Sequence, residues 1–202
     1  MTTAILIIAA YLIGSIPFGI IVGKMRGFDP RAVGSGNIGM TNVVRAGGTS
    51  AAALTFAGDM LKGTIPVAIA RMMDYPPEIL AWVGLAAFVG AIASVFLGFT
   101  GGKGISAALG VWLVLAPMPV LLALAAFGIT VAATRIVSLG SIVAAILLVP
   151  AAAALAPDRA YLLLAIAMSA LTLMRHHENI RRLVAGEEKP LGVGKSKAAK
   201  SS

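Results

Sequence analysis

Three short segments of this 202-residue chain combine glycine with polar and basic residues that suit phosphate. Residues 34–48 read GSGNIGMTNVVRAGG, residues 101–104 read GGKG, and residues 175–188 read RHHENIRRLVAGEE. Glycine allows consecutive backbone N–H groups to turn toward one anion, and Arg45 and Lys103 add positive charge. Lys103 also precedes an apolar segment, where the N-terminus of a helix favours an anion. Two such segments favour anion binding over a purely structural use of the glycines.

The glycine spacing imitates two nucleotide-binding motifs but lacks their context. Residues 34–39 match GxGxxG and Asp59 follows 20 residues later, but an apolar segment precedes the motif where a strand is required. GGKG lacks the P-loop spacing because position 97 is Leu and Gly follows Lys103. Cysteine, HExxH and GxSxG are also absent, which excludes thiol chemistry, a zinc-protease motif and a serine nucleophile elbow.

Two other features leave alternatives open. Asp59 and Lys62 are three residues apart, so they share a helix face and can pair, either for function or for helix packing. His176 and His177 could each act in proton transfer or bind phosphate, or could simply lie at the membrane interface. Neither has Asp five residues later, because both positions are Arg, so the His–Asp dyad common among acyltransferases is not available.

The composition is that of a membrane protein. Hydrophobic residues make up 59% of the chain and charged residues 12%, with a mean hydropathy of +0.96. Soluble domains are about 25% charged, and disordered chains are less hydrophobic. The net charge of +8 therefore reflects membrane topology, and no nucleic acid is expected as a partner. We predict one membrane domain over residues 1–190 and a disordered basic tail over residues 191–202.

Apolar segments predict an all-α integral membrane protein with seven transmembrane helices. Helices are expected because backbone polar groups must be satisfied within each span. The fourth segment, of 12 residues, is about 18 Å long against a core of about 30 Å, so five spans with a re-entrant segment over 99–134 is an alternative. The first segment lacks a basic n-region and is interpreted as a retained span. The segments are residues 3–22, 50–73, 79–98, 105–116, 119–134, 139–156 and 160–174.

Basic residues predict the orientation of these segments. In the seven-span arrangement most Lys and Arg residues fall in loops 23–49, 99–104 and 135–138 and after residue 174. Cytoplasmic loops carry such an excess, which places the N-terminus outside and the C-terminus in the cytoplasm. The five-span arrangement gives the same division of charge, so charge does not decide between them.

Five motifs in order resemble one enzyme family across residues 10–190. They are GSIPFG at 14–19, DMLKG at 59–63 and the three segments described above. The chain is similar to the bacterial membrane-bound acyl-phosphate:glycerol-3-phosphate acyltransferases, the PlsY family. The resemblance implies an enzyme of the cell inner membrane with its active site at the cytoplasmic face. Such an enzyme moves a fatty acyl group from acyl phosphate to the 1-hydroxyl of glycerol 3-phosphate, giving lysophosphatidic acid and phosphate for phospholipid synthesis.

The same resemblance implies the site residues. It selects His176 over its neighbour His177. The catalytic residues are expected to be Arg45, Lys103, Ser141, His176 and Asn179. Substrate binding is assigned to Ser35, Gly36, Asn37, Thr41, Asn42, Gly101, Gly102, Gly104 and Glu188, and supporting roles to Asp59, Lys62, Ser138 and Gly186.

An acyl phosphate is an activated mixed anhydride, so no covalent enzyme intermediate is required. Positioning and charge stabilisation could supply most of the catalysis, with Lys103 holding a phosphate and Arg45 neutralising charge. The proton of the attacking hydroxyl goes either to His176 or to the phosphate of the acyl donor, and we favour the phosphate. No cofactor and no metal are expected, and the partners are the two substrates and membrane lipid around a monomer.

A transporter for a phosphorylated metabolite is the alternative function. The intramembrane charges Asp59 and Lys62, the short fourth segment and the glycine-rich breaks would all suit a transporter. No inverted repeat is visible, although transporters are often built from such repeats. The polar motifs also lie on one membrane face, whereas alternating access needs a site that both faces can reach.

Overall fold

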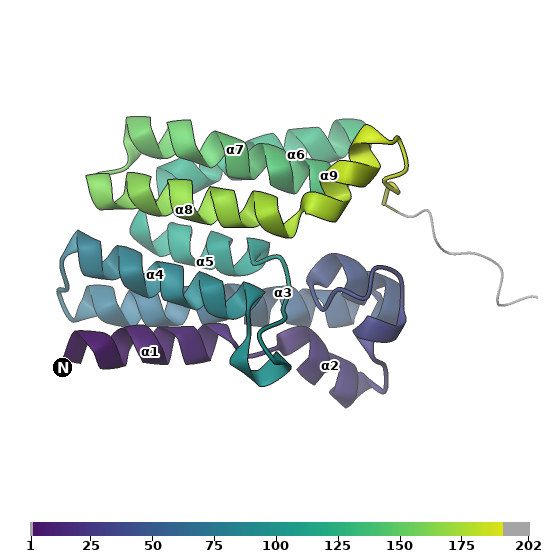
Figure 1. Ribbon diagram of the computed structural model, residues 1–202, viewed down its shortest axis with the longest axis horizontal. Helices are drawn as coiled ribbons and strands as arrows, with labels where there is room; N and C mark the ends of the chain where they lie inside the picture. Colours follow the sequence, from purple (N-terminus) through teal and green to yellow (C-terminus); the bar gives the residue numbers. More distant parts are fainter. Residues whose placement is uncertain (1, 192–202) are drawn as a thin grey trace, which may run out of the picture.

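The computed structural model describes residues 2–191, and this part of the chain is a bundle of helices (Figure 1). Helices α1, α3, α4, α5, α6, α7 and α8 run side by side along the long axis, and α2 and α9 lie toward one end. The 3₁₀ turns η1 (Pro30–Ala32) and η2 (Val95–Leu97) lie in loops. The α-helices are α1 (Thr2–Gly14), α2 (Phe18–Arg26), α3 (Met40–Met72), α4 (Pro77–Ile92), α5 (Ile105–Leu115), α6 (Pro117–Thr134), α7 (Val137–Leu155), α8 (Arg159–Arg175) and α9 (His177–Val184).

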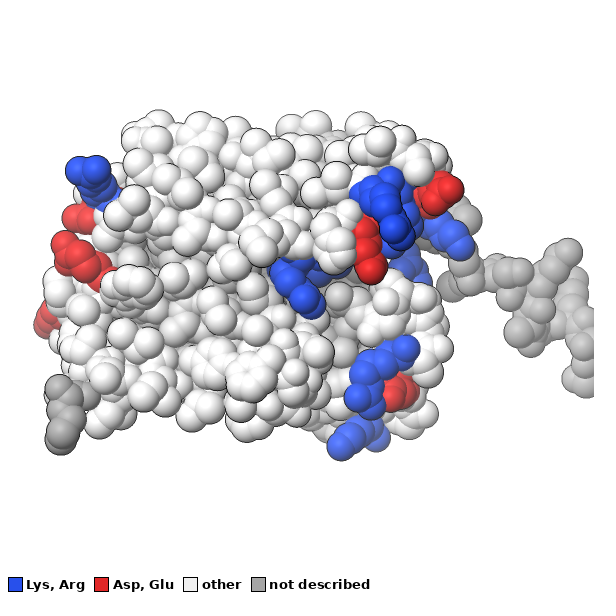
Figure 2. Space-filling view, in the orientation of Figure 1, with Lys and Arg blue, Asp and Glu red and all other residues white. Residues whose placement is uncertain are grey.

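Charged side chains gather at the two ends of the bundle, and the middle of the visible face carries almost none (Figure 2). Within residues 2–191, three stretches are long and apolar enough to cross a membrane: Thr2–Arg26, which joins α1 and α2, Pro117–Thr134 and Val137–Leu155. Helices α4 and α5 are apolar but shorter. This distribution suits a bundle embedded in lipid with its polar ends in water.

The first predicted helix, over residues 3–22, is wrong as a single element, because it breaks between Gly14 and Phe18. Pro17 lacks an N–H group and cannot continue the hydrogen-bond ladder of α1. Two distant side chains satisfy backbone carbonyls at the break. Lys62 Nζ donates to the carbonyl of Ile16 at 3.0 Å, and Ser94 Oγ donates to that of Ser15 at 2.6 Å. Side chains thus replace the missing backbone bonds inside the bundle.

The predicted loop over residues 23–49 is largely helical. Helix α2 continues to Arg26, and α3 begins at Met40, ten residues before the predicted start of its span. Gly48 interrupts α3 with a φ of 78° and a ψ of −177°, so residues 40–47 form a short helix of their own. A positive φ costs glycine little, which explains why the chain changes direction there.

The later predicted segments agree more closely with the helices. The predicted break after residue 116 is confirmed, since α5 ends at Leu115 and α6 begins at Pro117, a residue suited to the first turn. Helix α4 ends at Ile92, six residues before the predicted end at 98, because η2 follows. At residue 191, the first residue of the predicted tail, the Leu191 N–H donates to the carbonyl of Arg135 at 2.7 Å. Residues 192–202 lie outside the described residues.

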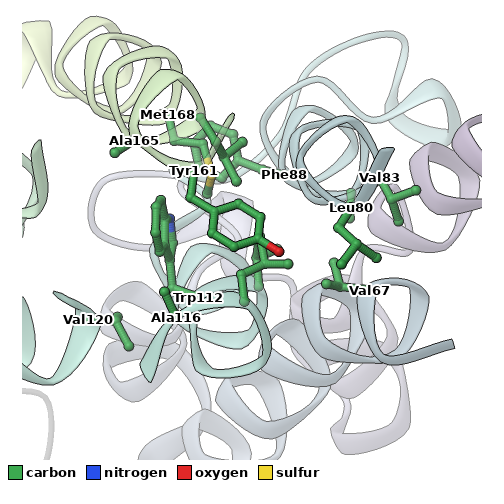
Figure 3. Packing of buried hydrophobic residues seen from close by; sticks show 14 of the residues in the cluster. Val67, Leu80, Val83, Phe88, Trp112, Ala116, Val120, Tyr161, Ala165 and Met168 are labelled. Atoms are coloured by element: carbon green, nitrogen blue, oxygen red, sulfur yellow. The ribbon is translucent and has the colours of Figure 1, made fainter. Parts of the chain in front are cut away.

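Small residues bring the helices of the bundle together. Helix α3 packs chiefly against α5, where a Cβ on Gly63 would overlap the carbonyl of Ala107 and one on Gly110 would overlap that of Met60. Such small residues are typical of membrane helix interfaces. Beside this contact, a cluster of buried apolar residues joins α4, α5 and α8, with Phe88, Trp112 and Met168 among its largest side chains (Figure 3). The bundle thus fixes α5 and the GGKG loop before it.

Candidate active site

One cavity of about 820 Å³ contains nearly all of the predicted site residues. Its polar wall comes from the loops before α3 and α5, the start of α7 and the α8–α9 junction, and its apolar wall from α5, α6, α7 and α8. Of the predicted residues, Gly36, Gly101 and Gly186 do not line it. The polar lining includes Ser35, Asn37, Thr41, Asn42, Arg45, Asp59, Lys62, Gly102, Lys103, Gly104, Ser138, Ser141, His176, Asn179 and Glu188.

Lys103 reaches this cavity from the loop that precedes α5. The next residue, Gly104, has a φ of +75°, and a Cβ there would overlap the ring of Phe88, so the turn needs glycine. Lys103 Nζ donates to Asn179 Oδ1 at 2.6 Å. Burial lowers the pKa of Lys103 to about 8, with Arg182 acting in the same direction and Glu188 opposing it. The ammonium group is therefore charged at pH 7, and its hydrogen-bond partner is a neutral amide.

Asn179 is held in turn by Glu188. Its Nδ2 donates to Glu188 Oε1 at 2.6 Å, Ser138 Oγ donates to the same oxygen at 2.7 Å, and Arg182 Nε donates to Oε2 at 2.6 Å. Burial raises the pKa of Glu188, but these three hydrogen bonds outweigh burial and lower it. The ionised carboxylate thus orients the amide that contacts Lys103. Glu188 was predicted to bind substrate, and the structure shows it engaged by three protein donors.

His176 is almost fully buried, at 1% exposure, at the junction of α8 and α9. Its Nδ1 lies 2.8 Å from the carbonyl oxygen of Thr172. A carbonyl only accepts, so Nδ1 carries the proton and Nε2 keeps its lone pair. Burial, aided by the charge of Lys103, lowers the pKa of His176 to about 4, so the ring is neutral at pH 7. His177 is exposed, with Nδ1 3.0 Å from the carbonyl of Met174.

The first glycine-rich loop is closed by its own asparagines. Asn42 Oδ1 accepts from the Ser35 N–H at 3.1 Å, and Asn42 Nδ2 donates to the carbonyls of Pro30 at 2.7 Å and Val33 at 2.9 Å. Asn37 Oδ1 accepts from the Gly39 N–H at 2.9 Å, at the start of α3. Asn42, predicted to bind substrate, therefore has both amide atoms engaged within the protein.

Arg45 follows this loop on the first turns of α3. Its side chain lines the cavity and is exposed, and within residues 2–191 it forms no ion pair. Ser35 and Thr41 line the cavity from the same segment. The loop thus presents a guanidinium group and hydroxyl groups to the cavity, while Asn42 maintains its shape.

The predicted pair of Asp59 and Lys62 forms on the cavity wall, with Lys62 Nζ 2.7 Å from Asp59 Oδ1. Because the same ammonium group satisfies the Ile16 carbonyl, the pair has a structural use at the α1–α2 break. Ser141 Oγ donates to the carbonyl of Val137 at 3.0 Å. These polar groups face the cavity but are each bonded within the protein.

Sequence reasoning missed two arginines. Arg175 donates to the carbonyls of the GGKG loop, from Nη2 to Gly101 at 2.8 Å and from Nε to Gly102 at 3.3 Å. Arg182 holds Glu188, as described above. Both residues lie in the third motif, but their partners are far away in the chain or beyond a turn, so no local spacing indicated them.

The comparisons with known proteins show the family and the fold of this chain. A family model described as "Glycerol-3-phosphate acyltransferase" matches residues 4–186. The chain belongs to this family. Glycerol-3-phosphate acyltransferases from Trichlorobacter lovleyi and Geobacter sulfurreducens are similar to it, with 50% and 46% identity. The alignments cover 93% of this chain and 97% of the first relative, and 91% of this chain and 95% of the second.

Two crystal structures of PlsY (YgiH), an integral membrane glycerol 3-phosphate acyltransferase, have the same fold. The glycerol 3-phosphate form superposes with a TM-score of 0.90 at 40% identity, and the lysophosphatidic acid form with 0.89 at 39%. Each match covers 95% of this chain and 96% of the PlsY chain. The predicted family is therefore confirmed, and the all-helical fold is that of an integral membrane glycerol-3-phosphate acyltransferase.

Proposed function

We propose that this chain transfers a fatty acyl group from acyl phosphate to the 1-hydroxyl of glycerol 3-phosphate, which yields lysophosphatidic acid and phosphate. The observation that carries the proposal is that a polar surface and an apolar surface line the same cavity. A basic, glycine-rich wall meets an apolar wall formed by α5, α6, α7 and α8. One substrate is a small polar phosphate and the other a phosphate with a long apolar chain, so the cavity suits both together.

Two of the basic residues that line the cavity, Lys103 and Arg45, have partly separate environments that suit two phosphates. Lys103 is half-buried beside Asn179, and Arg45 is exposed on the other glycine-rich segment. Charge-assisted hydrogen bonds from such groups bind phosphate strongly, and a guanidinium can do so with two parallel bonds. In a partly water-excluded site these charges also stabilise the leaving phosphate.

The reaction needs one nucleophilic displacement. The 1-hydroxyl oxygen forms a bond to the acyl carbonyl carbon, and the bond from that carbon to the bridging phosphate oxygen breaks. The proton of the hydroxyl goes to the departing phosphate, whose second pKa of about 6 makes it a stronger base than His176, at about 4. Neutral His176 then accepts a hydrogen bond at Nε2 and orients the hydroxyl, and no covalent enzyme intermediate forms.

The membrane arrangement that we propose has seven spans, formed by α1, α3, α4, α5, α6, α7 and α8, with the N-terminus outside. The basic loops and the C-terminus then lie in the cytoplasm, as the excess of Lys and Arg at that end supports. The polar wall of the cavity, formed by the glycine-rich loops, lies at the same end, so in this arrangement it faces the cytoplasmic side of the bacterial inner membrane, where both phosphorylated substrates are available. The cavity is built from one chain, so a monomer within membrane lipid is sufficient.

Purified protein in lipid nanodiscs, given palmitoyl phosphate and glycerol 3-phosphate, tests the reaction. We expect lysophosphatidic acid and inorganic phosphate in equal amounts by mass spectrometry and phosphate assay, and no product when palmitoyl-CoA replaces palmitoyl phosphate. Protein reconstituted in vesicles distinguishes the transporter alternative. Uptake of labelled glycerol 3-phosphate without release of phosphate from palmitoyl phosphate would overturn the proposal.

A further inference from the structure

The apolar part of the cavity ends at one residue on each of four helices. The deepest lining residue, farthest from the glycine-rich loops, is Trp112 on α5, Val120 on α6, Leu148 on α7 and Met168 on α8. Each is at most 7% exposed and belongs to the main buried cluster. We call these four side chains the floor, and the apolar space between this floor and Lys103 the acyl branch.

Trp112 is the largest side chain of the floor and is fully buried, at 0% exposure. Figure 3 shows its indole beside Ala116 and Val120, with Met168 above it. Among the described residues, Trp112 Nε1 is a buried polar atom without a hydrogen-bond partner. An apolar side chain of similar size would avoid that cost, so the contribution of Trp112 at this position is its bulk.

The depth of the acyl branch matches one lipid tail. Trp112 lies seven residues after Ile105 on α5, which is about 10 Å along the helix axis, and Leu148 lies ten residues after Ser138 on α7, about 15 Å. Half of a hydrocarbon core of about 30 Å is about 15 Å, the length that one tail occupies in one leaflet. A chain bound by its phosphate near Lys103 therefore reaches the floor.

Alanines keep the walls of the acyl branch open. Ala107 and Ala108 line it from α5, Ala123 from α6, and Ala144 and Ala145 from α7. Ala145 is 8% exposed, and its carbonyl accepts a hydrogen bond from Ser169 Oγ at 2.6 Å. A larger side chain at 145 keeps that backbone bond and fills the branch between Lys103 and the floor.

We propose that Trp112 closes the acyl branch and sets the longest acyl chain that the enzyme transfers efficiently, while Ala145 keeps the branch passable. The proposal rests on the proposed function, because it assumes that acyl phosphate is the donor. It assigns Trp112 a role in acyl-chain selectivity through contact with the end of the chain.

A series of saturated donors from octanoyl to eicosanoyl phosphate tests this role, with kcat/KM measured for each at saturating glycerol 3-phosphate. When a substrate carries one methylene group more than its pocket can hold, kcat/KM falls by about tenfold or more. For Trp112→Ala we expect the preferred chain to lengthen, with eicosanoyl gaining about tenfold relative to hexadecanoyl phosphate. For Ala145→Leu we expect the opposite change, about a tenfold loss of hexadecanoyl relative to octanoyl phosphate.

Leu80→Ala is the matched control, because Leu80 belongs to the same buried cluster on α4 but does not line the cavity. We expect this variant to lose stability without a change in chain preference, and the KM for glycerol 3-phosphate to stay unchanged in all three variants. Equal losses on every donor, or the wild-type preference in both cavity variants, would overturn the proposal. If Trp112→Ala does not fold, the chain preference of Ala145→Leu tests the proposal by itself. Absence of transfer by the wild type would instead refute the proposed function.

Fluorescence gives a second measurement that needs no turnover. The two tryptophans differ sharply, since Trp82 is 58% exposed and Trp112 is buried. In a Trp82→Phe background, a long alkyl phosphonate with bromine at its terminal carbon should quench Trp112. The same phosphonate with bromine beside the phosphorus should quench far less. Equal quenching by the two probes, at concentrations that inhibit acyl transfer, would place the chain end away from Trp112 and overturn the proposal.

Discussion

The two basic regions of the cavity hold their cations in different ways. Lys103 is half-buried and fixed by a chain of hydrogen bonds that runs through Asn179 to Glu188. Arg45 is exposed, while the loop before it is held by Asn42. A fixed charge costs no reorganisation during the reaction, whereas an exposed one can move onto a substrate that has already entered. The difference suggests that Lys103 acts mainly in the transition state and Arg45 mainly in binding.

The largest effect is expected from removing the fixed charge. Lys103→Ala should lower kcat/KM for acyl transfer by about a hundredfold or more, because a preorganised donor to developing charge is lost. Lys24 on α2 is exposed and does not line the cavity, so Lys24→Ala is the control and should be near wild type. More than about a tenth of the activity in folded Lys103→Ala protein would remove Lys103 from the site.

The next largest effect is expected at His176. His176→Ala should lose about a hundredfold in kcat, while His177→Ala stays nearly normal because that side chain is exposed. His176→Asn should keep part of the rate, since Asn can still hydrogen-bond the hydroxyl while the phosphate takes the proton. A completely inactive His176→Asn that still binds glycerol 3-phosphate would identify His176 as the base.

A smaller effect, mainly on binding, is expected at Arg45. Arg45→Lys keeps the charge but loses the fork that can form two parallel bonds, so the KM for one phosphate substrate should rise about tenfold with little change in kcat. Arg26→Lys on α2 is the control, because Arg26 is exposed and lies outside the cavity. Unchanged KM values for both substrates would contradict the proposed division between the two cations.

The pH dependence of kcat/KM should follow the ionisation of Lys103. Because the pKa of Lys103 is lowered to about 8, its charge is present below that pH and is lost as the pH rises through it. We expect kcat/KM to fall above pH 8, and Lys103→Arg, which stays charged, to lack this decline in whatever activity it keeps. His176, with a pKa of about 4, should produce no inflection between pH 5 and 8. An inflection near 6.5 that disappears in His176→Asn would contradict the neutral, non-basic role.

The smallest effect is expected from chelation. Lys103 and Arg45 supply the positive charge that the phosphates need, so acyl transfer should persist in excess EDTA. The measurement is the initial rate with and without chelator, and again after magnesium is added. Loss on chelation with recovery on magnesium would show that a metal ion, and not these two side chains alone, neutralises the phosphates.

The sequence by itself determined the class of the protein and the residues that gather at its site. Hydropathy located the later helices to within a few residues, because burial in lipid depends on runs of apolar side chains that any window can detect. The motifs selected the polar residues of the cavity, because glycine and basic residues suit phosphate whatever the fold.

Only the tertiary structure decided which of these polar atoms are already engaged. The sequence assigns Asn42 and Glu188 to substrate binding, yet each is bonded to partners within the protein. At the break near Pro17, the free backbone carbonyls likewise accept hydrogen bonds from side chains more than 40 residues away. Local spacing cannot reveal hydrogen bonds or cavity floors formed by helices far apart in the chain, because packing alone brings those residues together.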